Sequence, residues 1–356
     1  MENKGLLFIP DISGFTQFVS QTDIEHSRLI IQELLEILIN SNQIGLEVSE
    51  IEGDAILFYK FGNEPDLKEI YSQVEKMFTS FHRYIAAYNL NKFCQCKACL
   101  SAINLTLKVV THYGEFTGYN VKNFSKLIGK DVIVAHQLLK NDIDKHEYWL
   151  VTKNLASGEM PSELPAWLKW DSSSRQTESG EIPFQYAQLG QLLNEIPPEP
   201  EPDLELINKV KLASASHEYE TDIITLFHAS GIVGYRSQWQ AGVRKAEEFS
   251  HFLPRVGMKF KIFTDAGEEM MQASGFIFSQ ERISFSETNE KKTISNYFTL
   301  EQVSDNRIRL TWDYYEQKNF AAQLLFNLFR KSNKEKEMNL SLKKLETVAK
   351  TIHLPA

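Results

Sequence analysis

Two aspartates near the start of the chain restrict its fold more than any other feature. Asp11 ends the apolar segment 5–10, and Asp54 follows Gly53 in a tight turn between the strand-like segments 45–51 and 55–59. Two carboxylates that lie at the ends of neighbouring strands can bind a hard divalent cation and the phosphates that it carries. We therefore predict an α/β domain in which both acids share a site, although aspartate beside proline or glycine is also ordinary turn chemistry.

Length and composition limit the class of protein. A chain of 356 residues exceeds one ordinary core, so we expect two domains. With 42% hydrophobic and 24% charged residues the composition is that of a soluble globular protein. The net charge of −9 disfavours a nucleic-acid partner. We see no signal peptide and no run near the roughly 18 apolar residues of a membrane span, so we expect a cytoplasmic protein.

Prolines alternate with acids in the segment 196–203, which favours a stiff, extended linker. We predict a first domain over residues 1–195, a linker over 196–204 and a second domain over 205–356. A proline-capped surface loop within one domain is the alternative.

The apolar periodicity predicts the elements of both domains. In the first, we expect strands at 5–9, 45–51, 55–59, 105–112, 148–152 and 185–189, with helices at 24–39, 65–88 and 129–141. In the second, we expect strands at 260–263, 275–278, 283–286, 294–300 and 307–315, followed by one long helix over 320–352. The apolar face of that helix includes Leu324, Leu325, Leu328 and Phe329. Its lysine-rich run 330–336 is expected to be a solvated face and not a membrane anchor. The fold class is α+β in two domains.

The first domain carries a family resemblance over roughly residues 5–190. The segments 11–16 (DISGFT), 50–54 (EIEGD) and 111–115 (THYGE) resemble the catalytic domain of class III nucleotidyl (adenylate/guanylate) cyclases. The resemblance implies a ferredoxin-like α/β sandwich and a two-metal site for Mg or Mn at Asp11, Asp54 and the carbonyl of Ile12. It also implies that a purine nucleoside triphosphate is held by Ser13, Gly14, Phe15, Thr16, Glu50, Gly53 and Lys126, with Glu50 and Lys126 at base-reading positions.

The later part of the family pattern is not matched. Ile133 and Gln137 stand where the family has an asparagine and an arginine, and Gly180 and Glu181 stand near its late lysine. Loss of one preorganised donor costs about 10²–10³ in rate. We therefore assign no catalytic residue and predict a degenerate domain that binds metal and nucleotide. An active cyclase releasing a cyclic purine nucleotide and pyrophosphate is the alternative.

Three cysteines lie together at Cys94, Cys96 and Cys99. Thiolates at this spacing suit zinc, which needs a fourth ligand such as His82. Free cytosolic thiols are an equally good explanation.

The second domain resembles the START-like (SRPBCC, polyketide cyclase-type) helix-grip fold in the segments 235–243 and 255–260 and in its final helix. The resemblance implies an antiparallel sheet that grips a long C-terminal helix around a cavity for an apolar small molecule; aromatic residues could equally fill a solid core. Together the domains suggest a signalling or sensor protein, and a pure interaction module is the remaining alternative.

A homodimer is expected because the cyclase family shares each site between two subunits.

Overall fold

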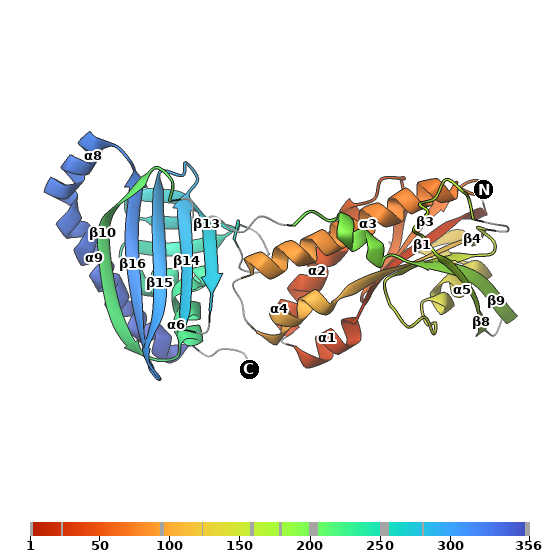
Figure 1. Ribbon diagram of the computed structural model, residues 1–356, viewed down its shortest axis with the longest axis horizontal. Coiled ribbons are helices and arrows are strands. Elements are labelled where there is room, and N and C mark those ends of the chain that lie inside the picture. The colour runs from red at the N-terminus through yellow and green to blue at the C-terminus, as the bar shows by residue number, and fades with distance from the viewer. Residues whose placement is uncertain are drawn as a thin grey trace. The chain divides into compact units, whose positions relative to one another are not determined.

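The computed structural model describes residues 3–22, 24–92, 96–122, 124–156, 160–177, 180–198, 206–249, 256–279 and 281–352. The chain divides into two compact units, each with its own sheet (Figure 1). Unit 1 comprises Met1–Asn89 and Lys97–Glu199, and unit 2 comprises Leu90–Cys96 and Pro200–Ala356. Of the predicted linker, residues 199–204 lie outside the described part of the chain.

The sheet of unit 1 is built around β1 (Lys4–Ser13), whose side chains from Gly5 to Ser13 are all buried. A continuously apolar strand needs cover on both faces, so it occupies an interior position. The seven strands run in the order β2-β3-β1-β4-β7-β9-β8. β1 pairs antiparallel with β3 and β4, and β4 pairs parallel with β7. Their bounds are β2 Glu47–Glu52, β3 Ala55–Phe61, β4 Thr106–Glu115, β7 Tyr148–Thr152, β8 Trp170–Thr177 and β9 Gly180–Gln188.

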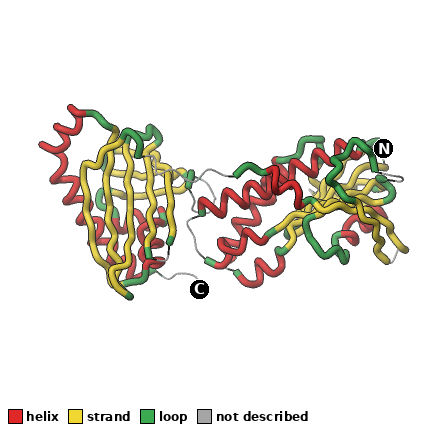
Figure 2. Tube along the Cα trace, in the orientation of Figure 1, coloured by secondary structure: helices red, strands yellow, loops and turns green. Residues whose placement is uncertain are grey.

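Helices cover both faces of this sheet. α5 (Lys130–Leu138) packs on the face that carries Leu7, Ile9 and Leu57. α2 (Ile24–Asn40) and the long α3 (Leu67–Asn91) lie on the other side (Figure 2). The shorter helices are α1 Phe15–Gln21, α4 Lys97–Ser101, η1 Ala102–Asn104 and η2 Gly190–Glu195.

Three strands of unit 1 were not predicted. β5 (Thr117–Val121) and β6 (Phe124–Ile128) form a separate two-stranded sheet, and β8 lies at the sheet edge. β5 is exposed along its whole length and β8 is largely exposed and polar, so neither shows apolar alternation. β4 also continues through Gly114, where it was predicted to stop. Glycine stands there because a side chain would collide with Asp131, so this residue marks close packing and not the end of the strand.

Unit 2 is a seven-stranded antiparallel sheet in the order β10-β16-β15-β14-β13-β12-β11. The strands are β10 Lys209–Glu220, β11 Val243–Glu248, β12 Lys259–Thr264, β13 Gly267–Phe278, β14 Arg282–Asn289, β15 Ile294–Ser304 and β16 Arg307–Gln317. The helices before β11 are α6 Ile223–Gly231, η3 Val233–Tyr235 and α7 Arg236–Trp239.

The C-terminal helix consists of α8 (Phe320–Leu325), a π-helical segment η4 (Phe326–Arg330) and α9 (Lys331–Thr351). α9 buries Met338, Leu342 and Leu345 in the core of unit 2. The predicted apolar face is wrong in its first half: Leu324, Leu325, Leu328 and Phe329 are exposed. The reason is that α8 extends past the end of the sheet (Figure 1). Within the described residues, no helix is long and apolar enough to cross a membrane.

Candidate functional site

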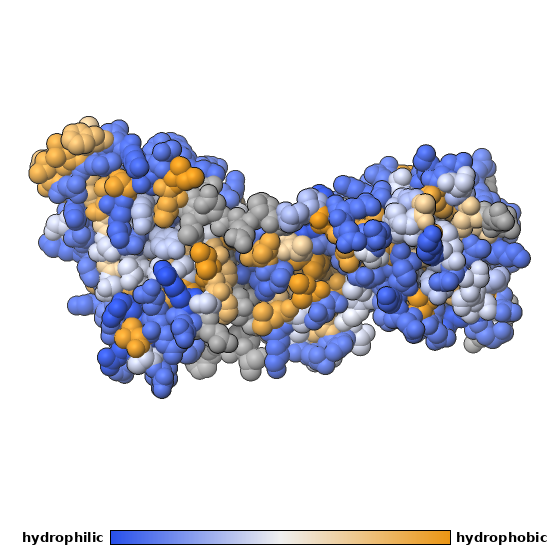
Figure 3. Space-filling view, in the orientation of Figure 1, coloured by the Kyte–Doolittle hydropathy of each residue, from blue (hydrophilic) through white to orange (hydrophobic). Residues whose placement is uncertain are grey.

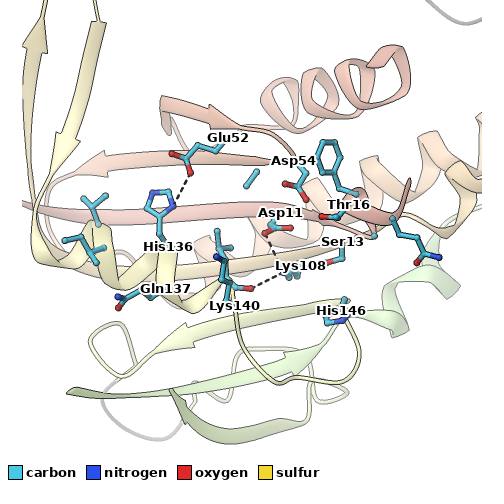
Figure 4. A pocket seen from close by; sticks show the side chains of 17 residues that line it. Asp11, Ser13, Thr16, Glu52, Asp54, Lys108, His136, Gln137, Lys140 and His146 are labelled. Carbon is cyan, nitrogen blue, oxygen red and sulfur yellow. Dashed lines mark hydrogen bonds and ion pairs between the residues drawn. The ribbon is translucent and has the colours of Figure 1, made fainter. Parts of the chain in front are cut away.

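A cleft of about 930 Å³ opens in unit 1 where β1 ends (Figure 4). The end of β1, the start of α1, the β2–β3 turn, β4 and α5 form its walls. Of the predicted site residues, those that line it are Asp11, Ser13, Gly14, Phe15, Thr16, Asp54, Ile133 and Gln137. Ile12, Glu50, Gly53 and Lys126 are not in its lining.

The two aspartates meet because the β2–β3 turn is fastened to the end of β1. The Ile12 amide donates to the Asp54 carbonyl oxygen at 3.0 Å, and Asp11 stands opposite Ala55 in the strand register. Gly53 has φ 63°, a conformation that glycine adopts without strain. Both carboxylates therefore point into one part of the cleft (Figure 4).

Burial perturbs both carboxylates. The pKa of Asp11 is raised to about 6: desolvation is the main cause, Lys108 opposes the shift, and the neighbouring charge of Asp54 adds to it. The pKa of Asp54 is also raised, mainly by burial. Such shifts mean that the negative charges of the site are incompletely compensated by the protein.

Lys108 is a site residue that was not predicted from the sequence. It faces Asp11 across the β1–β4 register, and its Nζ lies 3.5 Å from Asp11 Oδ2 and donates to the Leu139 carbonyl at 3.1 Å. The signal was present, because Lys108 is a lone charge in the otherwise apolar core of a strand. The cleft thus contains a cation of its own.

The donor set fits a hard divalent cation. It consists of the Asp11 and Asp54 carboxylates, which line the cleft, whereas Ile12, the third predicted ligand, lies outside the lining. An all-oxygen set of this kind suits Mg or Mn. Lys108 competes for Asp11, so a bound cation would have to displace its ammonium group.

The glycine turn adds an unused hydroxyl to the cleft. Within the described residues, Ser13 Oγ is buried without a hydrogen-bond partner, and Ser13 lines the cleft. Gly14 follows with φ 89° and starts α1. α1 has only seven residues, so its dipole contributes less than the resemblance implies. The Ser13 hydroxyl is the more specific binding group at this turn.

The two predicted base-reading residues contact each other. Lys126 Nζ bonds Glu50 Oε2, which joins β6 to β2. His136 bridges the acids, with Nε2 3.8 Å from Glu50 Oε1 and Nδ1 3.7 Å from Glu52 Oε2. Among the described residues, Glu50, Glu52 and His136 could together hold a metal ion, but Lys126 already occupies one carboxylate. His136 and Glu52 line the cleft and were not predicted.

The positions that depart from the cyclase pattern also lie at the cleft. Ile133 is exposed, and Gln137 Oε1 is buried without a hydrogen-bond partner among the described residues. Lys140 and His146 also line the cleft, and neither was identified from the sequence. Lys108 and Lys140 therefore supply positive charge from positions that the family pattern does not mark.

A buried network holds α5 beside the cleft. His112 Nδ1 lies 2.8 Å from Thr152 Oγ1, and its Nε2 lies 3.0 Å from Asp131 Oδ1. Asp131 Oδ2 accepts the Glu115 amide at 2.7 Å. Because Asp131 is in the first turn of α5, these bonds fix the helix that carries His136.

The cysteine cluster is only partly described. Cys94 lies outside the described residues, Cys96 is half-buried and Cys99 is buried in α4. His82 Nε2 lies 3.7 Å from Glu147 Oε1, and burial lowers the His82 pKa to about 4. The zinc site remains a prediction.

Unit 2 contains a second cleft, of about 490 Å³. Its apolar wall includes Ile262, Met271 and Ile294, and its polar members include Asn296 and Lys334. Trp312 Nε1 donates to Asn296 Oδ1 at 2.9 Å, which ties the cleft wall to the buried polar residues beneath it.

Comparisons with known proteins match parts of the chain. Residues 31–148 match the family model "Protein of unknown function (DUF2652)". An uncharacterized protein of Mycobacterium tuberculosis (strain ATCC 25618 / H37Rv) is 32% identical over 124 residues, 35% of this chain and 58% of that protein. The chain therefore spans less than two thirds of the length of this relative.

Several solved structures are similar at low identity. A bacterial light-regulated adenylyl cyclase has 16% identity and a TM-score of 0.39, over 55% of this chain and 98% of that chain. The guanylate cyclase domain of RhGC from Catenaria anguillulae, in complex with GTP, has 13% identity and a TM-score of 0.36, over 52% and 97%. A Bacillus halodurans protein solved in solution has 13% identity and a TM-score of 0.30, over 40% and 99%. These scores are too low to transfer an activity to this chain.

Proposed function

We propose that unit 1 is a degenerate class III cyclase-like domain that binds a purine nucleoside triphosphate together with a divalent cation. The observation that carries this proposal is the convergence of Asp11 and Asp54, both with raised pKa, in one cleft beside Lys108. Two desolvated acids that one ammonium group compensates only partly form a site that gains free energy when a cation binds.

The residues have separable roles in binding. The carboxylates of Asp11 and Asp54 and the Ile12 carbonyl would hold the cation, which supplies charge neutralisation for the phosphates. Lys108, once released from Asp11, can donate to a phosphate oxygen. The unpaired Ser13 hydroxyl can donate to another, and Lys140 adds positive charge at the cleft wall.

Binding without conversion is the function that these side chains support best. Ile133 has no polar group with which to orient a ribose, and Gln137 is neutral where charge stabilisation is needed. Each lost donor costs about 10²–10³ in rate. In this proposal, the occupancy of the cleft by metal and nucleotide is the signal that the chain senses.

An active cyclase is the second candidate, and one observation favours it. Lys108 and Lys140 bring positive charge to the cleft from other positions, which could replace the missing arginine and lysine. Incubating the protein with GTP or ATP and Mn²⁺, followed by chromatography for cyclic product, separates the candidates. Product that disappears in Asp11→Ala and Asp54→Ala would establish the cyclase. Thermal stabilisation by metal and nucleotide without product supports the binding protein. If neither product nor stabilisation is observed, an interaction module is the remaining function.

The same proposal includes a homodimer. Apolar side chains are exposed on β2, β5 and β6, namely Ile51, Val121 and Ile128. Burying these side chains against a second copy would remove the apolar surface from water and complete a site shared between two subunits. Light scattering on Ile51→Lys and Ile128→Lys should then show monomers; a wild type that is already monomeric would refute the dimer.

For unit 2 we propose a START-like domain that binds an apolar small molecule in its cleft. The apolar wall of Ile262, Met271 and Ile294 supports this assignment. Displacement of a fluorescent fatty acid, compared between wild type and Met271→Lys, tests it. Equal displacement in both proteins would argue that the cleft is not the binding site.

A further inference from the structure

The start of the C-terminal helix carries an exposed apolar surface. Its residues are Phe320 (84% exposed), Phe329 (73%), Leu328 (65%), Leu325 (57%) and Leu324 (53%), named here the α8 patch. The segment from Phe320 to Phe329 contains no charged residue. Figure 3 shows the end of unit 2 formed by α8 as a continuous apolar area. Contiguous apolar surface of this kind marks an interaction site.

The patch is exposed although its helix is firmly attached. Phe326 is buried and stacks on Tyr314, with ring centroids 5.9 Å apart. The Asn319 side chain caps α8 by accepting the Ala322 amide at 3.2 Å. The π-helical segment Phe326–Arg330 directs Phe326 inward while Leu328 and Phe329 stay exposed. π-helical turns occur frequently at functional sites.

Basic side chains flank the patch. Between residues 318 and 337 there are five basic residues, Lys318, Arg330, Lys331, Lys334 and Lys336, and two acids, Glu335 and Glu337, which pair with Lys331 and Lys334. Of the five, Lys318, Arg330, Lys331 and Lys336 are exposed. This local excess of positive charge stands in a chain whose net charge is −9. The charge therefore selects an anionic partner.

We propose that the α8 patch docks on the surface of an anionic lipid bilayer. Phenylalanine and leucine side chains enter the boundary between headgroups and acyl chains, and the flanking lysine and arginine side chains meet the anionic headgroups. The segment is too short to span a bilayer, so it lies in the interface. Arg330 and Lys334 also line the unit 2 cleft, so docking places that cleft beside the membrane.

Sedimentation of the full chain with large vesicles tests the proposal. We expect binding to vesicles of phosphatidylcholine with phosphatidylserine, and little binding to phosphatidylcholine alone. Phe320→Ser combined with Phe329→Ser should weaken partitioning into vesicles at least about tenfold, since the two aromatic side chains that enter the bilayer are lost. Both residues are exposed, so the thermal unfolding of the variant should match the wild type. Ile277→Ser, at another exposed apolar residue of unit 2, is the matched control and should bind normally.

The charge is tested separately by Lys331→Gln combined with Lys336→Gln, which should weaken binding to anionic vesicles most at low salt. Absence of wild-type binding to anionic vesicles, or unchanged binding by the Phe320→Ser/Phe329→Ser protein, would overturn the proposal. A self-association lost in that variant, without vesicle binding, would instead assign the patch to contacts between copies of the chain and would likewise overturn it.

Discussion

Each unit contains an acid paired with a base in largely buried surroundings, and the two pairs differ in how well they are satisfied. In unit 2, Arg236 in α7 donates to Glu287 in β14 through Nη1 at 2.9 Å and Nη2 at 2.7 Å. In unit 1, Lys108 reaches Asp11 by one contact of 3.5 Å. The first geometry is a bidentate hydrogen-bonded pair, whereas the second is a looser electrostatic contact.

The surroundings enlarge the difference. Glu287 also accepts from Asn296 at 3.2 Å, and the Arg236 guanidinium lies 5.2 Å from the Trp239 ring and 5.5 Å from the Phe298 ring. Asp11 borders an open cleft, and its pKa is raised to about 6 despite Lys108. A buried pair joined by two hydrogen bonds specifies the fold, even though Arg236 Nε has no partner among the described residues. An under-compensated pair at a cleft remains able to bind a ligand.

The largest expected effect is the loss of the unit 2 pair. Arg236→Met leaves Glu287 buried without its main partner, so the free energy of unfolding of unit 2 should fall by about 3–5 kcal/mol. Urea denaturation followed by tryptophan fluorescence measures this change. A loss below about 1 kcal/mol would show that Glu287 finds other compensation and that the pair is not structural.

Two further variants sharpen this result. Arg244→Met removes an exposed ion pair with Asp265 and should change the unfolding free energy by less than about 0.5 kcal/mol. Replacing both partners, as Arg236→Met with Glu287→Leu, should recover most of the stability, because no buried charge is left unpaired.

The next effect concerns Lys108. If its ammonium group competes with a cation for Asp11, Lys108→Met should strengthen Mn²⁺ binding by at least about tenfold, since the repulsion between the cation and the nearby ammonium group is removed and about 1.4 kcal/mol corresponds to tenfold. Isothermal calorimetry at pH 8, where Asp11 is ionised, measures the affinity. Lys4→Met removes an exposed partner of Glu115 and is the control. Equal affinities in all three proteins would mean that Asp11 is not a metal ligand.

Metal affinity should also depend on pH. The pKa of Asp11 is raised to about 6, so protons compete with the cation below this value, and affinity rises as the pH increases through it. Between pH 7 and pH 5 we expect a loss of about tenfold from this group, and the raised pKa of Asp54 adds in the same direction. Asp11→Asn should bind weakly and with a flatter profile. A wild-type affinity independent of pH would contradict the assignment.

Short sequence motifs and periodicity predicted several strands and the two acids of the cleft. They did not predict contacts between side chains on strands that are far apart in the sequence. β7 lies at Tyr148–Thr152, where periodicity predicted a strand, because it is apolar and fully buried. β8 was missed because its exposed residues are polar. Asp11 and Asp54 could be paired from the motif. Lys108 is visible in the sequence as a lone charge in an apolar strand, but its pairing with Asp11 depends on the β1–β4 register, which no short segment encodes. The exposure of the α8 patch was equally unpredictable, because periodicity shows an apolar helix face but not where the sheet ends.

The smallest expected effect tests a third pair, between Lys126 and Glu50. Lys126 has a side chain 43% exposed, against 15% for Glu50, so solvent screens their contact. Lys126→Ala should therefore cost less than about 1 kcal/mol of unfolding free energy, well below the loss for Arg236→Met. The resemblance to cyclases assigns Lys126 and Glu50 to base recognition, so the variant should change the ratio of GTP to ATP affinity more than it changes stability. A large loss of stability with an unchanged ratio would place this pair with Arg236 and Glu287, as a structural contact.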